Sequence, residues 1–107
     1  MGEKKTWGEL DTFLMIIGKQ FGPCEILLFG SCAEGSDWGK SDYDLIIISE
    51  KFAGMHWLDR ISAVVKNWNL IEDIDVIPYT PEEFELKKKN SSFIRGIVRK
   101  SVSLASN

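Results

Sequence analysis

The sequence predicts a small α/β (α+β) protein in which helices pack on a small mixed β-sheet. Two uninterrupted apolar runs, at 26–29 and 45–48, are typical of strands that are buried on both faces. Apolar residues also recur at three- and four-residue steps before, between and after these strands, as they do on one face of a helix. The 107 residues suffice for one core, so we expect a single domain over 1–107.

The first half of the chain predicts a helix and two strands. Thr6 and Glu9 form a capping-box pattern that would begin a helix, and Gly18 followed by Gly22-Pro23 would end it. Strands are expected at about 24–29 and 43–49, joined by a turn-rich loop. The buried face of the helix would carry Leu10, Phe13, Leu14 and Ile17.

The second half predicts a helix over about 55–68 and a strand over 70–77 that Pro78 ends. Thr80 begins a second capping box, with Pro81 at its first helical position and a Tyr79–Phe84 contact across the helix start. Asn90-Ser91-Ser92 interrupts this helix, and a further short helix follows. The predicted order is therefore αβ-loop-βαβα.

The most informative stretch joins the first two strands. Gly30-Ser31 follows the first strand, and Asp42 and Asp44 lead into the second. Side chains at i and i+2 of a strand project from the same face, so the two carboxylates point together. They repel each other unless a cation lies between them, and their hard oxygen ligands suit Mg²⁺ or Mn²⁺. The sequence therefore predicts a divalent-metal site at Asp42 and Asp44.

The opposite side of this site favours phosphate. Gly30 permits close approach of a backbone, and Ser31 brings a hydroxyl and an amide to an expected helix start. Taken alone, Asp-x-Asp is usually solvated and Gly-Ser is usually only a turn. Both at one fixed spacing arise by chance about once in a thousand chains of this size, from residue usage of about 5–7%. The combination indicates a nucleoside triphosphate bound as its metal complex.

Gly30-Ser31, ten residues and Asp42-Tyr43-Asp44 resemble the Gly-Ser-x10-Asp-x-Asp motif of the DNA polymerase β-like nucleotidyltransferases. The chain length resembles the minimal nucleotidyltransferase (MNT) family, often encoded beside a HEPN-domain partner. This resemblance implies a third metal-binding carboxylate on the next strand, and Asp75 matches it. Because Asp75 is flanked by Ile74 and Val76, we expect it to be buried. One departure is Glu34, where the family often has arginine, which removes a positive charge near the expected triphosphate.

The resemblance implies a Mg²⁺-dependent transfer of AMP from ATP to a tyrosine hydroxyl of a HEPN ribonuclease toxin, with this chain as the antitoxin. Asp42, Asp44 and Asp75 would hold the metal and act in catalysis, and Gly30 and Ser31 would bind the nucleotide. Nothing after the core would build an acceptor domain, so we expect the acceptor on another protein. Glu34 supports an alternative, in which the chain neutralises its partner by contact with weak or no catalysis.

Charge and composition narrow the remaining classes. Positions 1–86 carry a formal charge of −9, whereas 87–107 carry six basic residues and no acid. This basic segment favours an anionic partner surface. Direct nucleic-acid binding is a weaker prediction, because no aromatic is interleaved with 87–89. Two cysteines and one histidine argue against zinc. Without a signal-type or membrane-spanning apolar run, we expect a cytoplasmic protein, and homo-oligomer formation stays open.

Overall fold

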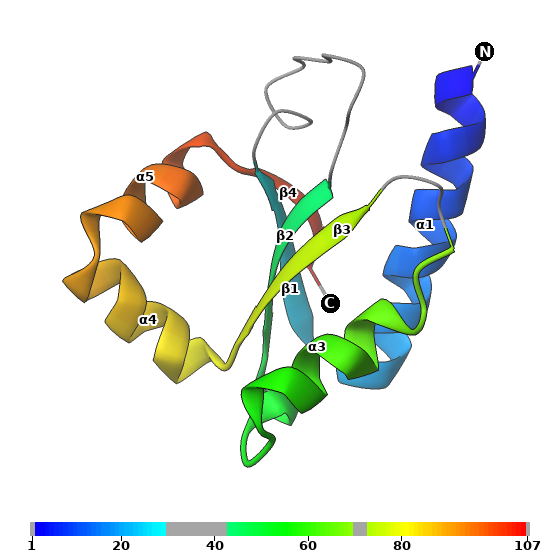
Figure 1. The fold of residues 1–107 in the computed structure, drawn as a ribbon. Helices are drawn as coiled ribbons and strands as arrows, with labels where there is room; N and C mark the ends of the chain where they lie inside the picture. Colours follow the sequence, from blue (N-terminus) through cyan, green and yellow to red (C-terminus); the bar gives the residue numbers. More distant parts are fainter. Residues whose placement is uncertain (1, 30–42, 70–72, 107) are drawn as a thin grey trace.

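A four-stranded mixed sheet forms the middle of the protein, and helices cover both of its faces (Figure 1). The computed structural model describes residues 2–29, 43–69 and 73–106. The elements follow the chain as α1 (Gly2–Phe21), β1 (Cys24–Phe29), β2 (Tyr43–Ser49), the 3₁₀ turn η1 (Glu50–Phe52), α3 (Trp57–Val65), β3 (Ile74–Tyr79), α4 (Pro81–Asn90), α5 (Ser92–Lys100) and β4 (Val102–Ser106). The predicted fold class is confirmed.

The strand order across the sheet is β3-β2-β1-β4. β1 runs antiparallel to both β2 and β4, whereas β2 and β3 are parallel and are connected through α3. β1 and β2 therefore lie in the centre, which explains their continuous apolar sequences. Ile46 and Ile47 point to opposite faces, and neither has any exposed surface.

Each face of the sheet has its own core. The first core lies under α1 and α3, where Phe13, Ile17 and Val64 pack against the even-numbered residues of β1 and the odd-numbered residues of β2. The second lies under α4 and α5, where Phe84 and Ile97 cover Leu27, Ile46 and Ile48. In Figure 1 these helix pairs lie on opposite sides of the sheet.

The first helix begins earlier than predicted, and it ends directly before Gly22-Pro23, as predicted. α1 begins at Gly2, so Thr6 lies inside the helix instead of capping it. Glu3, Lys4 and Lys5 are good helix formers, which explains the earlier start. Gly18 does not end the helix, because the N–H of Gly22 donates to its carbonyl at 3.0 Å and the helix continues to Phe21.

Two strands also correct the sequence interpretation. Pro78 lies inside β3 instead of ending it, which is permitted because β3 is an edge strand and proline can stand where no N–H is needed for pairing. β4 was not predicted, and it forms through pairing with β1. α3 is shorter than the helix predicted over 55–68 and ends at Val65. Tight turns follow it, in which the N–H groups of Asn67 and Trp68 donate to the carbonyls of Val64 and Val65.

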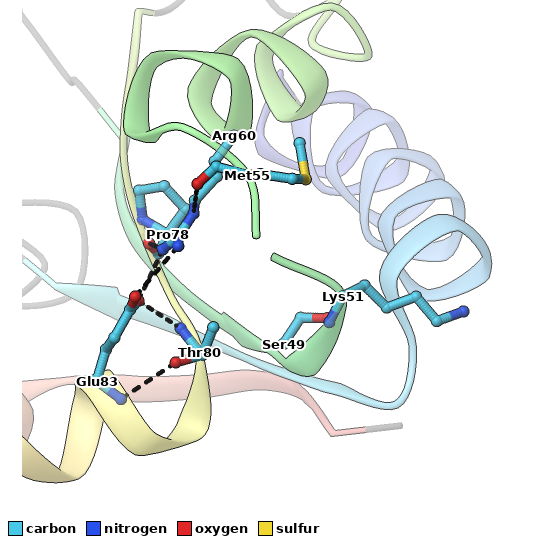
Figure 2. A network of polar contacts seen from close by, with 7 residues as sticks. All are labelled: Ser49, Lys51, Met55, Arg60, Pro78, Thr80 and Glu83. Carbon is cyan, nitrogen blue, oxygen red and sulfur yellow. Dashed lines mark hydrogen bonds and ion pairs between the residues drawn. The ribbon is translucent and has the colours of Figure 1, made fainter. Parts of the chain in front are cut away.

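The start of α4 agrees with the prediction. The hydroxyl of Thr80 accepts from the N–H of Glu83, and the Glu83 carboxylate accepts from the N–H of Thr80, so both halves of the capping box are present (Figure 2). The rings of Tyr79 and Phe84 lie 6.2 Å apart between centroids. Ser91 ends α4 and caps α5, where its hydroxyl accepts from the N–H of Ile94.

Candidate functional site

Asp44 and Asp75 lie directly beside each other on neighbouring parallel strands. They are register partners in the β2–β3 ladder, so their side chains project from the same face of the sheet. Neighbouring strands are about 4.8 Å apart, a spacing at which two carboxylates can share one cation. The structure thus brings together two of the three carboxylates that the sequence singled out.

These carboxylates stand at the amino ends of β2 and β3. Phe29, the last residue of β1, is the register partner of Asp44 on its other side. Phe29 packs against the core under α4 and α5, so this row of three residues belongs to that face. The face is apolar beyond the row, where Ile46 is the next residue of β2 on the same side of the sheet. The carboxylates therefore mark the boundary between the core and the polar end of the sheet.

The expected burial of Asp75 is wrong. Asp44 is half-buried and Asp75 is exposed, although Val76 after it is buried. β3 is an edge strand, so its residues on one face can reach solvent while their neighbours fill the core. An exposed carboxylate needs no partner to offset burial, and Asp75 is open to a substrate.

The other predicted site residues lie outside the described residues. These are Gly30 and Ser31, which follow Phe29 directly, and Asp42, two positions before Asp44. Glu34, the departure from the family pattern, also lies outside the described residues. Their roles remain predictions from the sequence.

The described part of the site fits a hard divalent cation by its chemistry. Asp44 and Asp75 offer carboxylate oxygens only, which suit Mg²⁺ and Mn²⁺ better than zinc. Among the residues described here, no group of three or more His, Cys, Asp or Glu side chains is gathered closely enough to hold a metal. A complete ligand set would thus draw on Asp42 and on the substrate phosphates.

A second polar cluster lies at the opposite end of β3 and was not predicted. Arg60 on α3 is 6% exposed, and its guanidinium uses all three nitrogens. Nε donates to the carbonyl of Met55, Nη1 to that of Pro78, and Nη1 and Nη2 donate to the two carboxylate oxygens of Glu83 at 2.7 and 3.1 Å (Figure 2). The sequence did contain a signal for this cluster. Arg60 lies one helical turn before Val64, so a charged residue shares a helix face with an apolar one, and both are buried in the structure.

The Arg60–Glu83 pair borders a pocket of about 540 Å³ that is also lined by Trp57, Tyr79 and Lys87. The rings of Trp57 and Tyr79 lie 5.7 Å apart, and the guanidinium lies 5.9 Å from the Trp57 ring centroid. Hydrogen bonding from Arg60 lowers the pKa of Glu83, against a smaller opposing effect of burial. Burial raises the pKa of Tyr79, and the charge of Glu83 adds to this.

The single histidine, one tryptophan and one cysteine lie away from the two carboxylates. His56 is exposed at the N-cap of α3 and its side chain makes no capping hydrogen bond. Trp68 packs against the first core, with its ring 5.0 Å from that of Phe13. Cys24 is buried and free, and burial raises the pKa of its thiol. None of them stands in the row formed by Asp44 and Asp75.

Comparisons with known proteins agree with this geometry. Residues 15–107 match the family model for Polymerase beta, Nucleotidyltransferase, and the chain belongs to this family. It is a nucleotidyltransferase-like domain, with carboxylates at the amino ends of two parallel strands.

Two solved structures share the fold. A candidate nucleotidyltransferase from Sulfolobus solfataricus superposes with a TM-score of 0.66 at 18% identity, over 94% of this chain and 79% of that one. A second candidate nucleotidyltransferase has a TM-score of 0.64 at 27% identity, over 92% of this chain and 99% of that one. No curated protein matches the chain significantly.

None of the helices in the described ranges is long and apolar enough to cross a membrane.

Proposed function

We propose that this chain is a Mg²⁺-dependent nucleotidyltransferase that transfers AMP from ATP to a hydroxyl of a partner protein. The observation that carries the proposal is the register pairing of Asp44 with Asp75 on one face of the sheet. Two carboxylates side by side on adjacent strands repel each other and destabilise the fold, so a purely structural role does not explain them. Family membership supports the same reaction class.

In the proposed reaction, the carboxylates bind the metal and the Gly-Ser turn binds the nucleotide. Asp42, Asp44 and Asp75 would hold Mg²⁺, and Gly30 and Ser31 would bind the triphosphate. A bound divalent cation would stabilise negative charge on the phosphate oxygens. The acceptor oxygen would attack the α-phosphorus, and the bond to the bridging oxygen would break to release pyrophosphate. Asp75 is exposed and would take the proton of the acceptor hydroxyl.

The partner follows from the resemblance to the MNT family, which points to a HEPN-domain protein and a toxin–antitoxin pair. The six basic residues after position 86, with no acid among them, would add electrostatic attraction to an acidic surface.

The test uses labelled ATP with Mg²⁺ and the protein encoded next to this chain. We expect label on that protein with the wild type, and a loss of at least a hundredfold in rate with Asp44→Asn or Asp75→Asn. Asp73→Asn is the matched control, because Asp73 is exposed and lies just before β3, and it should stay within about twofold. Circular dichroism would show that all variants fold. Undiminished transfer by both site variants would refute the assignment.

A contact-only role is the second candidate, and the observation that favours it is Glu34 in place of the family's usual arginine. In that case Asp44→Asn and Asp75→Asn would still suppress the partner's activity in cells, and no label would appear with the wild type. Glu34→Arg separates the two roles, because it should raise transfer only in a chain that catalyses it.

A further inference from the structure

β3 is an edge strand, so one side of its backbone is not paired with another strand of the sheet. The N–H of Tyr43 on β2 donates to the carbonyl of Asp73 at 2.9 Å, which fixes the alternation along the strand. Asp75, Ile77 and Tyr79 turn their backbone groups toward β2, and Ile74, Val76 and Pro78 turn theirs outward. Within the described part of the chain, no hydrogen bond reaches the outward groups of Ile74 and Val76.

The other end of this edge is closed. Pro78 has no N–H, and its outward carbonyl already accepts from Nη1 of Arg60 at 3.1 Å. An added strand could therefore pair only beside Ile74 and Val76. These two residues flank Asp75, so any strand added there would run past the carboxylate row.

The pocket beside the closed end supplies a place for a side chain of such a strand. Its aromatic walls, Trp57 and Tyr79, suit a large apolar or aromatic group. The charges of Arg60 and Glu83 cancel in their ion pair. Lys87 is exposed and makes no ion pair with any described residue, which leaves the pocket with a net positive charge.

We propose that the acceptor segment of the partner protein binds here in an extended conformation, as an added strand on β3. Its backbone pairs with Ile74 and Val76, its hydroxyl-bearing residue lies at Asp75, and an aromatic or large apolar side chain with a neighbouring carboxylate enters the pocket beside Lys87. This inference rests on the proposed function. Asp75 and Tyr79 are four residues apart on one face, about 13 Å, so hydroxyl and anchor are about four residues apart.

The test begins with random twelve-residue peptides displayed on phage and selected on the whole chain without ATP or metal. We expect enriched peptides to combine an aromatic residue with a neighbouring acid. Trp57→Ala should weaken their binding at least tenfold, as loss of an interface anchor does, and Lys87→Glu by about fivefold. Met15→Ala and Lys19→Glu are the controls, because both residues are exposed on α1, which contributes nothing to the pocket lining or to the basic segment, and they should stay within about twofold.

Backbone pairing is tested on the peptide alone. Methylation of single peptide nitrogens should weaken binding at alternate positions only, since a paired strand turns every second N–H to its partner. No enrichment, or an equal effect of methylation at all positions, would overturn the proposal. So would a dimer in sedimentation equilibrium that Ile74→Pro disrupts and Ile74→Ala does not, because a second copy would then occupy the edge.

The two proposals fail separately. Peptide binding is measured without nucleotide, so a chain that binds these peptides but labels no protein would refute the transfer reaction and leave the docking site. A chain that labels its partner equally well as wild type, Trp57→Ala and Lys87→Glu would refute the docking site and leave the reaction.

Discussion

Arg60 on α3 and Glu83 on α4 meet around the edge of β3 and join the two helix layers of the protein by two parallel hydrogen bonds (Figure 2). Planar guanidinium and carboxylate groups match in this arrangement, which is stronger than a single contact. Because Arg60 is only 6% exposed, its buried positive charge is compensated by the Glu83 carboxylate and by the two carbonyls that it contacts, and not by water.

Glu83→Gln should lower the free energy of unfolding by about 1–3 kcal/mol, because it leaves the buried guanidinium without an opposite charge. Urea denaturation measures the change. Glu85→Gln is the matched control on the same helix, since its partner Lys88 is at the surface and the change should stay within about 0.5 kcal/mol. Equal effects of the two substitutions would contradict the structural role of the pair.

The same carboxyl predicts a dependence of stability on pH. The pKa of Glu83 is lowered in the folded protein from its ordinary value of 4.5, chiefly by the hydrogen bonds from Arg60. Its contribution is therefore complete above pH 4.5 and is lost as the pH falls through the lower folded pKa. Unfolding curves of wild type and Glu83→Gln should differ most near neutral pH and converge in acid. A gap that is constant down to the lowest pH would refute this.

Two glycines should respond oppositely to alanine. A Cβ at Gly22 would lie 2.2 Å from the carbonyl oxygen of Gly18, a backbone atom, so Gly22→Ala should destabilise by about 2 kcal/mol or more. Gly96 lies inside α5 with nothing within 4 Å of an added Cβ, and Gly96→Ala should stabilise by about 0.5–1 kcal/mol. Thermal unfolding compares the two, and changes of the same sign would count against the packing described.

Ser49 should matter more than its size suggests. It is 1% exposed; its hydroxyl donates to the carbonyl of Phe21 at the end of α1 and accepts from the N–H of Lys51. Ser49→Ala leaves both groups without this partner and should cost about 1–2 kcal/mol in urea denaturation. Ser62→Ala on the exposed face of α3 is the control, and a similar loss there would argue against a specific role for Ser49.

Sequence patterns predicted the elements whose own residues carry a clear apolar or capping pattern. β1 and β2 have the predicted bounds because their apolar runs are buried on both faces. β4 was missed because Val102–Ser106 has no such run and becomes a strand only by pairing with β1, across most of the chain. The exposure of Asp75 and the position of Pro78 inside β3 were not predicted for a related reason. Both depend on β3 being an edge strand, and the local sequence does not show where a strand lies in the sheet.

The carboxylates of the candidate site were predicted from the sequence, whereas the pocket beside Arg60 was not. The i, i+2 rule identified Asp44, the resemblance to the nucleotidyltransferase motif identified Asp75, and the register of β2 with β3 pairs them. Asp42, Gly30 and Ser31 stay predictions. The pocket was invisible in the sequence because its walls come from α3, β3 and α4, and the Arg60–Glu83 contact spans 23 positions.

The pairing of β4 with β1 has a consequence for synthesis of the protein. Phe29 and Val102 are 73 positions apart, which a ribosome covers in about 4–15 s at about 5–20 residues per second. During that interval β1 can pair with β2, but its other side lacks the strand that later covers it. The nascent chain thus carries an open, apolar sheet edge for several seconds, which is long enough for a ribosome-associated chaperone to bind.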